Sequence, residues 1–382
     1  MEHKKNWQDK IVDALMLRKL PVTNVPSYMY NISYWTGSIA LSALLWEFIT
    51  GPLLLLYYNV AHPYTSTQFI INSVPFGSVI LFTHTYGAYI MIVALYIHAM
   101  RHFLVGAYKK PRQWVWVIGV VLFLLTLGVS FFGYNLIGDA LSYDARDVAI
   151  GMASGVPLGG AISSLLFGLG TTAQIFSRLL GLHIILALSI LVVFIVHFLL
   201  FEKSGATPSI KKAPTAPAIN SEEERKALGS WWPQIFLYTM AIVLITWAII
   251  MIIPNAIVQI NNLPSLISPF PGPSPTSAAA ASAVPYPPWF LLPVYKIADF
   301  LLPNGSPFTP LINVGLIAVV SLVMLALPFI DRSKYRSPIK RKFWTALAFA
   351  FISWLIVLTV WGAISPGVQI TTNIQLLNLL PP

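Results

Sequence analysis

The sequence is short of charge for its length. Only 9% of its 382 residues are Asp, Glu, Lys or Arg, whereas 57% are apolar, and its mean hydropathy is strongly positive. Soluble domains carry roughly 25% charged residues. This composition excludes an ordinary soluble domain and predicts an integral membrane protein.

Cysteine is missing altogether. The chain can therefore form no disulfide, hold no thiolate-bound iron–sulfur cluster and attach no haem through cysteine. Any such centre in a complex with this chain must belong to a partner.

Charges are especially scarce within seven apolar runs, each long enough to cross the ~30 Å of hydrocarbon in a bilayer. The runs lie at residues 34–59, 78–104, 114–134, 174–201, 231–253, 311–330 and 343–363. We therefore expect an all-α membrane protein with seven transmembrane helices.

Basic residues are unevenly distributed between the connecting segments. The N-terminus, the inner end of the second run and the loops after the second, fourth and sixth runs hold 20 of the 23 Lys and Arg residues. By the positive-inside rule these segments face the cytoplasm, which places the N-terminus inside and the C-terminus outside. The net charge of +10 thus reflects topology, and we expect no binding of nucleic acid.

The segments between the runs divide the chain into four expected parts. They are an amphipathic surface segment at 1–30, a four-helix bundle at 31–201, a solvated cytoplasmic linker at 202–230 and a three-helix part at 231–382. Two outer loops, 135–173 and 254–310, are long enough to be functional.

Two of the runs carry paired histidines. His84 and His98 lie fourteen positions apart in the second run, and His183 and His197 have the same spacing in the fourth. Each pair therefore shares one helix face, with its members ~21 Å apart along the axis. Both runs enter the membrane from the outside, so His84 would face His183 near the outer surface and His98 would face His197 near the inner one. A four-helix bundle can hold two haems in this way.

Histidines inside a membrane can also have roles other than haem ligation. A lone intramembrane histidine is more often a hydrogen-bonded packing residue than a ligand, but four at matched spacing and depth favour ligation. A zinc or di-iron centre is disfavoured, because no carboxylates accompany the histidines. The remaining His3, His62 and His102 lie toward a terminus or a membrane edge, where we expect surface residues.

Glycines repeat the same interval. Gly37 and Gly51 lie in the first run, and Gly119 and Gly133 lie in the third. A macrocycle between helices requires a close approach of the neighbouring backbones, which glycine allows. Glycine also helps membrane helices pack, but two pairs in register with two histidine pairs favour the haem interpretation.

With these residues in place, the chain resembles cytochrome b of the quinol-oxidising, Rieske-containing bc-type respiratory complexes. The resemblance runs from "NISYW" at 31–35 to the seventh run. The segment "RLLGLH" keeps the family's arginine as Arg178, and "HAMR" keeps Arg101, which the resemblance makes a propionate partner of the inner haem. It implies two non-covalently bound haems, of b type or a variant.

The resemblance also implies a quinol-oxidation site at the outer face. Tyr134 matches one of its residues, the segment Pro287-Pro288-Trp289-Phe290 matches the family's Pro-Glu-Trp-Tyr motif, and Tyr295 lines up with a later tyrosine. Pro288 replaces the glutamate that accepts a proton from quinol in the family. Without the resemblance, these aromatic residues would suit an interfacial belt equally well.

Some other base must collect the protons that quinol oxidation releases. Asp144 and Asp147 in the outer loop are the nearest candidates, although both would also suit ordinary loop charges paired with Arg146. Glu47 departs from the family as well, since a glutamine is common there. A carboxyl inside the membrane is expected to stay protonated or to pair with a polar neighbour.

The function that the resemblance implies is electron bifurcation. One electron of quinol would pass to a Rieske iron–sulfur protein and on to a cytochrome c or another terminal acceptor, and the other would cross the membrane through the two haems to reduce quinone. The family forms homodimers, and we expect one in the plasma membrane of a prokaryote.

Two alternatives remain open. The chain could be a haem-containing anchor that relays electrons between quinone and another redox subunit without bifurcation. It could also be a transporter whose histidines relay protons, but that would require polar residues along helices that are otherwise apolar.

Overall fold

The structure is a computed structural model that describes residues 24–168, 170–221, 228–260, 266–283, 287–302 and 306–364. Seven of its helices are long and apolar enough to cross a membrane. They are α2 (Thr36–Leu55), α4 (Gly77–Leu104), α5 (Gln113–Asn135), α8 (Thr172–Ser204), α10 (Phe236–Ile257), α12 (Thr309–Ile330) and α13 (Lys342–Ile364). Each coincides with one of the seven apolar runs, so the predicted fold class is confirmed.

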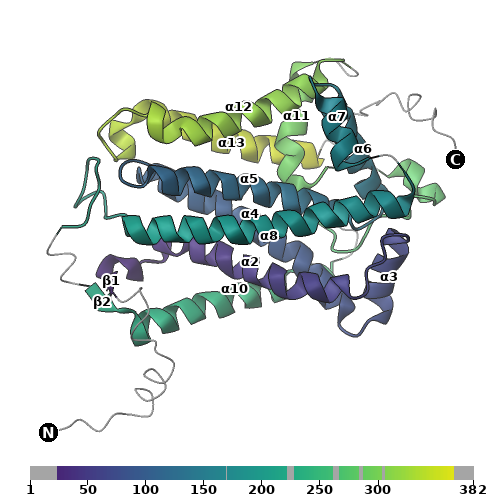
Figure 1. The fold of residues 1–382 in the computed structure, drawn as a ribbon, viewed down its shortest axis with the longest axis horizontal. Helices are drawn as coiled ribbons and strands as arrows, with labels where there is room; N and C mark the ends of the chain where they lie inside the picture. Colours follow the sequence, from purple (N-terminus) through teal and green to yellow (C-terminus); the bar gives the residue numbers. More distant parts are fainter. Residues whose placement is uncertain are drawn as a thin grey trace, which may run out of the picture.

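The long helices run nearly parallel to one another in one elongated bundle (Figure 1). At its centre α2 packs against α4, and α5 packs against α8. The C-terminal helices are divided between two sides of this core, with α10 on α2 and α4 and α12 on α5. The helices of the expected three-helix part are therefore not packed as one unit: α10 and α12 pack on different sides of the four-helix bundle, and α13 packs against α11 (Leu292–Leu301).

Short helices gather at one end of the bundle, which we call the loop end. They are α3 (Pro63–Ser73), α6 (Ala140–Ser154), α7 (Gly159–Leu166) and α11 (Leu292–Leu301), with two 3₁₀ turns, η5 (Ala278–Ser282) and η6 (Trp289–Leu291). The segments that we expected to be long outer loops are thus largely helical where the structure describes them. α6 begins at an N-cap, where Asp139 accepts a hydrogen bond of 2.8 Å from the backbone N–H of Ser142.

The opposite end carries most of the basic residues, and we call it the basic end. A two-stranded antiparallel ribbon joins β1 (Asn24–Pro26) to β2 (Leu228–Ser230) there. Residues 1–23, most of the expected surface segment, lie outside the described residues. The expected solvated linker is partly packed, since Ala206, Thr207 and Ala218 are buried.

Cations at the basic end hold this packing together. Arg112 donates hydrogen bonds of 2.7–3.1 Å to the carbonyl oxygens of Ser204, Gly205, Ala206 and Ala218. Arg336 is fully buried and donates to carbonyl oxygens of Val105, Pro208 and Ala213. Burial lowers the pKa of both guanidinium groups to about 10, so both remain charged at neutral pH. Arg112 and Arg336, whose charges contribute to the predicted topology, therefore also stabilise the packing of the basic end.

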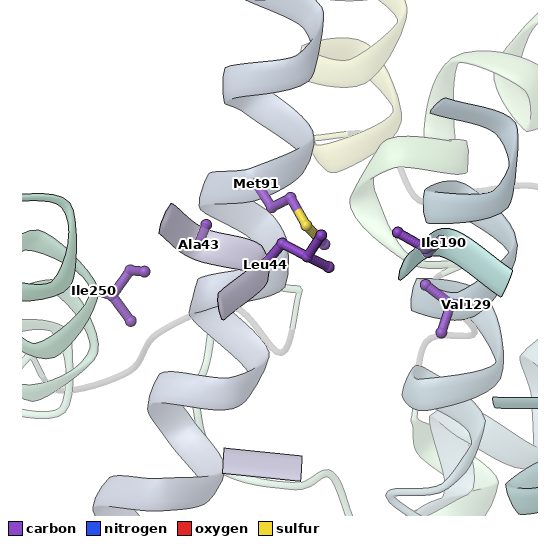
Figure 2. Close-up of a cluster of buried hydrophobic side chains, with 6 residues drawn as sticks. All are labelled: Ala43, Leu44, Met91, Val129, Ile190 and Ile250. Carbon is purple, nitrogen blue, oxygen red and sulfur yellow. The ribbon is translucent and has the colours of Figure 1, made fainter. Parts of the chain in front are cut away.

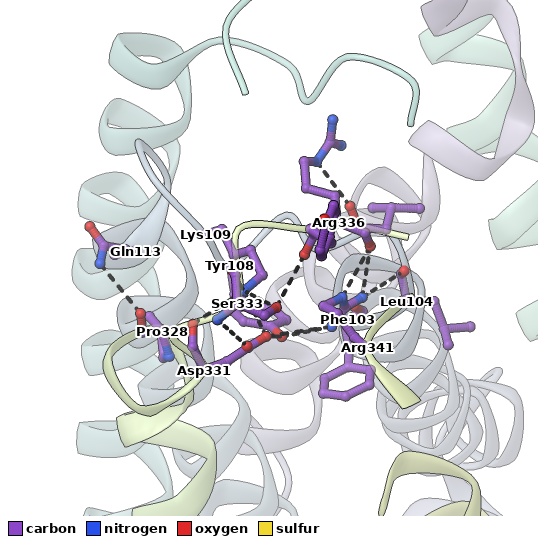
Figure 3. A network of polar contacts seen from close by, with 12 residues as sticks. Phe103, Leu104, Tyr108, Lys109, Gln113, Pro328, Asp331, Ser333, Arg336 and Arg341 are labelled. Carbon is purple, nitrogen blue, oxygen red and sulfur yellow. Dashed lines mark hydrogen bonds and ion pairs between the residues drawn. The ribbon is translucent and has the colours of Figure 1, made fainter. Parts of the chain in front are cut away.

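Asp331 lies among Lys109, Arg341 and Tyr108 at the basic end (Figure 3). Its Oδ2 lies 2.7 Å from Nζ of Lys109 and 3.8 Å from a guanidinium nitrogen of Arg341, and it accepts a hydrogen bond from the Tyr108 hydroxyl. The side chains of Lys109, Arg341 and Asp331 are all buried. A buried carboxylate with several charge-assisted partners is expected to be a strong structural anchor.

An apolar layer crosses the middle of the bundle. Its buried members are Ala43, Leu44, Met91, Val129, Ile190 and Ile250, drawn in Figure 2. Leu44, Met91 and Ile190 lie seven positions from each member of the glycine or histidine pair on their own helix. That spacing is ~10 Å along the axis, so the layer separates the two levels at which the histidines lie.

Candidate functional site

The four paired histidines come from α4 and α8, as their spacing predicts. We name His84 and His183 the outer pair and His98 and His197 the inner pair, after the sides that they are predicted to face. In the outer pair the ring centroids are 6.3 Å apart and the ring planes make an angle of 68°. With metal–nitrogen bonds of about 2 Å, two imidazoles on opposite sides of one metal have ring centres roughly 6 Å apart. The outer pair therefore fits one iron between its two rings.

The Nδ1 atoms of three histidines have polar partners on neighbouring helices. Nδ1 of His84 lies 2.9 Å from Oγ1 of Thr50, Nδ1 of His98 lies 3.1 Å from Oγ1 of Thr36, and Nδ1 of His183 lies 2.9 Å from the carbonyl oxygen of Val129. Such contacts fix the orientation of a ring and leave Nε2 as the ligand atom. Thr36 and Thr50 are fourteen positions apart, a repeat that sequence analysis missed although the spacing would have revealed it.

The inner pair has an additional neighbour. His98 and His197 are within electrostatic range of each other, and the ring centroid of His102 lies 4.4 Å from that of His98. His102 was expected at the surface, but it is only partly exposed, and its ring packs against that of His98 at an interplanar angle of 54°. The reason is helical periodicity, since a residue four positions after His98 lies on the same helix face.

Each of the four repeated glycines lies against one of the four histidines. A Cβ placed on Gly37 would be 2.9 Å from Cε1 of His98, and one on Gly133 would be 2.9 Å from Cε1 of His183. The corresponding distances are 3.4 Å for Gly51 and His84, and 3.1 Å for Gly119 and His197. The glycines were expected to admit a macrocycle, and in the structure they admit the imidazole rings themselves.

The two predicted arginines lie near the two levels. Arg101 is partly buried, and its guanidinium carbon lies 4.0 Å from the ring centre of Tyr34. Arg178 donates a 3.4 Å hydrogen bond from Nε to the carbonyl oxygen of Phe167. Arg101 follows His98 by three positions and Arg178 precedes His183 by five, so each lies within two helical turns of a histidine.

Aromatic residues converge at the loop end, beyond the outer pair. The ring of Trp289 lies 6.0 Å from that of Tyr89, edge to face, and Tyr134 is within electrostatic range of both Tyr89 and Tyr295. The hydroxyl of Tyr295 is buried and has no hydrogen-bond partner among the described residues. Pro287 is buried directly before this group. The structure thus brings together the residues predicted for a quinol site and adds Tyr89.

Acidic residues of the loop end lie beside this aromatic group. Asp139 and Asp144 are both within electrostatic range of Tyr134. Burial, together with the negative charges of Asp147 and Asp139, raises the pKa of Asp144 above its ordinary value. Arg146 donates hydrogen bonds of 2.8 and 3.0 Å to Asp147 and none is found to the Asp144 carboxylate in the described ranges. The two candidate bases are therefore not equivalent.

Asp139 has a structural role that sequence analysis did not identify. Its Oδ2 accepts a 2.6 Å hydrogen bond from the backbone N–H of Gly272, while Oδ1 caps α6 through Ser142. Burial raises the pKa of Asp139. One carboxylate thus fastens the segment before Trp289 to the start of α6, and only the folded chain brings these segments together.

Among the described residues, no cluster of three or more His, Cys, Asp or Glu side chains could hold a metal ion by itself. The arrangement of paired imidazoles suits a metal whose other ligands come from a prosthetic group.

Two family profiles match the chain. Residues 89–275 match the one described as cytochrome b(N-terminal)/b6/petB, and residues 278–380 match the one described as cytochrome b(C-terminal)/b6/petD. A cytochrome b of Sulfolobus acidocaldarius is 45% identical over 393 residues, which cover 100% of this chain and 70% of that protein. A cytochrome b6 of Heliobacterium modesticaldum is 35% identical over 207 residues, 52% of this chain and 97% of that protein.

The fold has a counterpart among solved structures. A chain of a structure described as a hyperthermophilic respiratory complex III superposes with a TM-score of 0.74 at 21% identity. The superposition covers 97% of this chain and 94% of that chain. Because the two profiles together cover most of the chain and a relative matches its full length, the chain belongs to the cytochrome b family.

Proposed function

We propose that the chain is the di-haem cytochrome b subunit of a quinol-oxidising complex of the respiratory complex III type. The observation that carries this proposal is the pairing of four histidines from α4 and α8 at two levels, with the outer ring centroids 6.3 Å apart. His84 and His183 would hold the outer haem, and His98 and His197 would hold the inner one. Bis-histidine haem iron supplies one-electron redox chemistry.

Residues of the chain orient the histidines and keep water out of the space between the two pairs. The contacts of Thr36, Thr50 and Val129 with Nδ1 atoms orient three of the ligands. The apolar layer around Leu44, Met91 and Ile190 keeps polar side chains out of the space between the two levels. Arg101 is in the right part of α4 to neutralise a propionate of the inner haem, whose charge is costly to bury alone.

Quinol would bind at the loop end, beside the outer pair, among Tyr89, Tyr134, Trp289 and Tyr295. The buried hydroxyl of Tyr295, which has no partner among the described residues, is a free polar group for an oxygen of quinol. Oxidation releases two electrons and two protons. One electron would pass to a Rieske iron–sulfur partner and then to a cytochrome c or another acceptor, and the haem held by His84 and His183 would supply the one-electron chemistry that the other requires.

Asp144 would accept one of the two protons in place of the family's glutamate, and the other proton would leave with the electron that passes to the iron–sulfur partner. The raised pKa of Asp144 makes it a better base for a phenolic proton than an ordinary aspartate, and it is within electrostatic range of Tyr134. Tyr134 and Trp289 would hold the quinol ring between them and the outer pair. With the basic end in the cytoplasm, the proton accepted by Asp144 would leave on the outer side of a prokaryotic plasma membrane.

The test is the haem content and quinol reactivity of the purified complex. We expect two extractable haems per chain, both reduced by a soluble quinol analogue under anaerobic conditions. Full turnover should require the iron–sulfur partner. A complex without haem would contradict the proposal, and steady quinol oxidation without that partner would favour a simple relay anchor.

The glycine contacts give a prediction of their own. Replacement of Gly133 with alanine should expel or distort the outer haem, because the new Cβ would be 2.9 Å from His183 Cε1. Overpacking of this kind costs about 1–3 kcal/mol. The haem-to-protein ratio and the melting temperature are the measurements.

Gly128→Ala on the same helix is the matched control, because its Cβ would meet Leu186 at an ordinary distance of 3.6 Å. Both replacements change helix propensity equally, so only the contact with His183 distinguishes them. Equal haem content and equal melting temperature in the two variants would contradict the assigned role of Gly133.

A further inference from the structure

A glutamate in the membrane bundle contacts an outer histidine. Glu47 of α2 places Oε2 2.8 Å from Nδ1 of His84, and the side chains are only 13% and 20% exposed. The other carboxylate oxygen, Oε1, is buried and has no hydrogen-bond partner in the described part of the chain. A carboxylate is thus held against the ring atom that would lie opposite the iron.

Gly87 provides the space for this carboxylate. A Cβ on Gly87 would collide with Oε1 of Glu47, so the backbone of α4 is open where the carboxylate lies. Gly87 follows His84 by three positions, and Thr50, the other partner of the same Nδ1, follows Glu47 by three. The contact is therefore built by both helices around the ring of His84.

At the inner pair, the place that corresponds to Glu47 has no carboxylate. The fourteen-residue repeat relates Glu47 to Ser33 and Gly87 to Arg101. The outer pair therefore has a carboxylate and a glycine where the inner pair has a hydroxyl residue and a guanidinium group. Arg101 is partly buried next to Tyr34, on the same helix as His98.

We propose that Glu47 is a positioning residue that acts through His84 and lowers the reduction potential of the outer haem. This inference rests on the proposed di-haem function. A carboxylate that accepts the Nδ1 proton of a metal-bound histidine makes the ring a stronger donor to the metal. It also favours the more positive, oxidised iron, and in a medium of low dielectric this effect is large.

The experiment is a redox titration of the holo-complex, followed optically, in wild type and in Glu47→Gln. Glutamine keeps the size and a hydrogen-bond acceptor but removes the charge. We expect the outer potential to rise by at least about 59 mV, which corresponds to a tenfold change in the equilibrium constant of a one-electron reduction. The inner potential should stay unchanged.

Two further variants complete the test. Thr50→Val removes a hydrogen bond to the same Nδ1 without changing charge, so its shift should be clearly smaller than that of Glu47→Gln. Glu47→Asp should keep most of the low potential, and it replaces Glu47→Gln as the deciding variant if glutamine prevents haem binding. In that case the proposal requires two results. The outer potential of Glu47→Asp should equal that of wild type, and the outer potential of Gly87→Ala, which displaces the carboxylate, should be higher. An unchanged outer potential in Gly87→Ala would overturn the proposal.

The outcomes separate this proposal from the proposed function. Wild-type complex without two haems would overturn the function itself. Two haems in both wild type and Glu47→Gln, with the same two potentials, would leave the function standing and overturn the role of Glu47. Equal shifts of both haems would also overturn it, because the carboxylate contacts only the outer pair.

Discussion

Replacement of Asp144 with asparagine is expected to slow quinol oxidation about a hundredfold, the lower range of what a positioned general base contributes. The reason is that Asp144 lies within electrostatic range of Tyr134 and has a raised pKa, while Pro288 leaves the motif without its carboxylate. Haem content should stay normal, because Asp144 lies on α6, whereas the paired histidines lie on α4 and α8. The measurement is steady-state turnover with quinol.

The pH dependence distinguishes a base from a structural residue. Because the pKa of Asp144 is raised, its basic form is lost as the pH falls through that raised value, and turnover should fall with it. Asp144→Asn should lack this acid limb. Unchanged turnover and an unchanged pH profile in Asp144→Asn would contradict the assignment.

Asp147→Asn is the matched control. Asp147 is paired with Arg146 and is 40% exposed, so its replacement should leave turnover within the same order of magnitude. Its negative charge helps to raise the pKa of Asp144. The acid limb of Asp147→Asn should therefore move to lower pH.

Replacement of Asp331 with alanine is expected to destabilise the basic end by about 3–5 kcal/mol, the usual cost of removing one partner from a buried ion pair. The change would leave Lys109 and Arg341 buried with no carboxylate between them. Burial by itself raises the pKa of Asp331, but hydrogen bonds from Lys109 and Tyr108 outweigh it and hold the pKa below 3.8. The stabilisation is therefore present above that pH and is lost only as the pH falls through the lowered value.

Thermal unfolding of the detergent-solubilised complex measures this effect at neutral pH. Arg332→Ala is the control, because the adjacent Arg332 is exposed and forms no ion pair with Asp331. Asp331→Ala should melt well below both wild type and this control. Equal melting temperatures would show that the buried cluster contributes little net stability.

The histidine and glycine pairs could be predicted from sequence because their spacing is a property of single helices. Fourteen residues return to nearly the same face, and no knowledge of neighbouring helices is needed to see that His84 and His98 are aligned. The seven spans were predictable for the same reason, since length and hydropathy are local.

Other features depend on contacts between distant segments. Arg336 bonds carbonyl groups more than 120 residues away, which no local pattern shows. The pairing of Glu47 with His84 depends on the register of α2 against α4. The helices α3 and α6 were missed because their sequences are polar and rich in small residues, and packing at the loop end decides their conformation.

The central claim is that two pairs of histidines hold two separate haems, and a redox-titrated optical spectrum of the purified complex tests it most directly. The spectrum should be recorded for wild type, His183→Leu and His98→Leu. We predict two low-spin components at separate potentials, with the outer component lost in His183→Leu and the inner one lost in His98→Leu. A spectrum without haem, or a single component that neither replacement changes, would contradict the account.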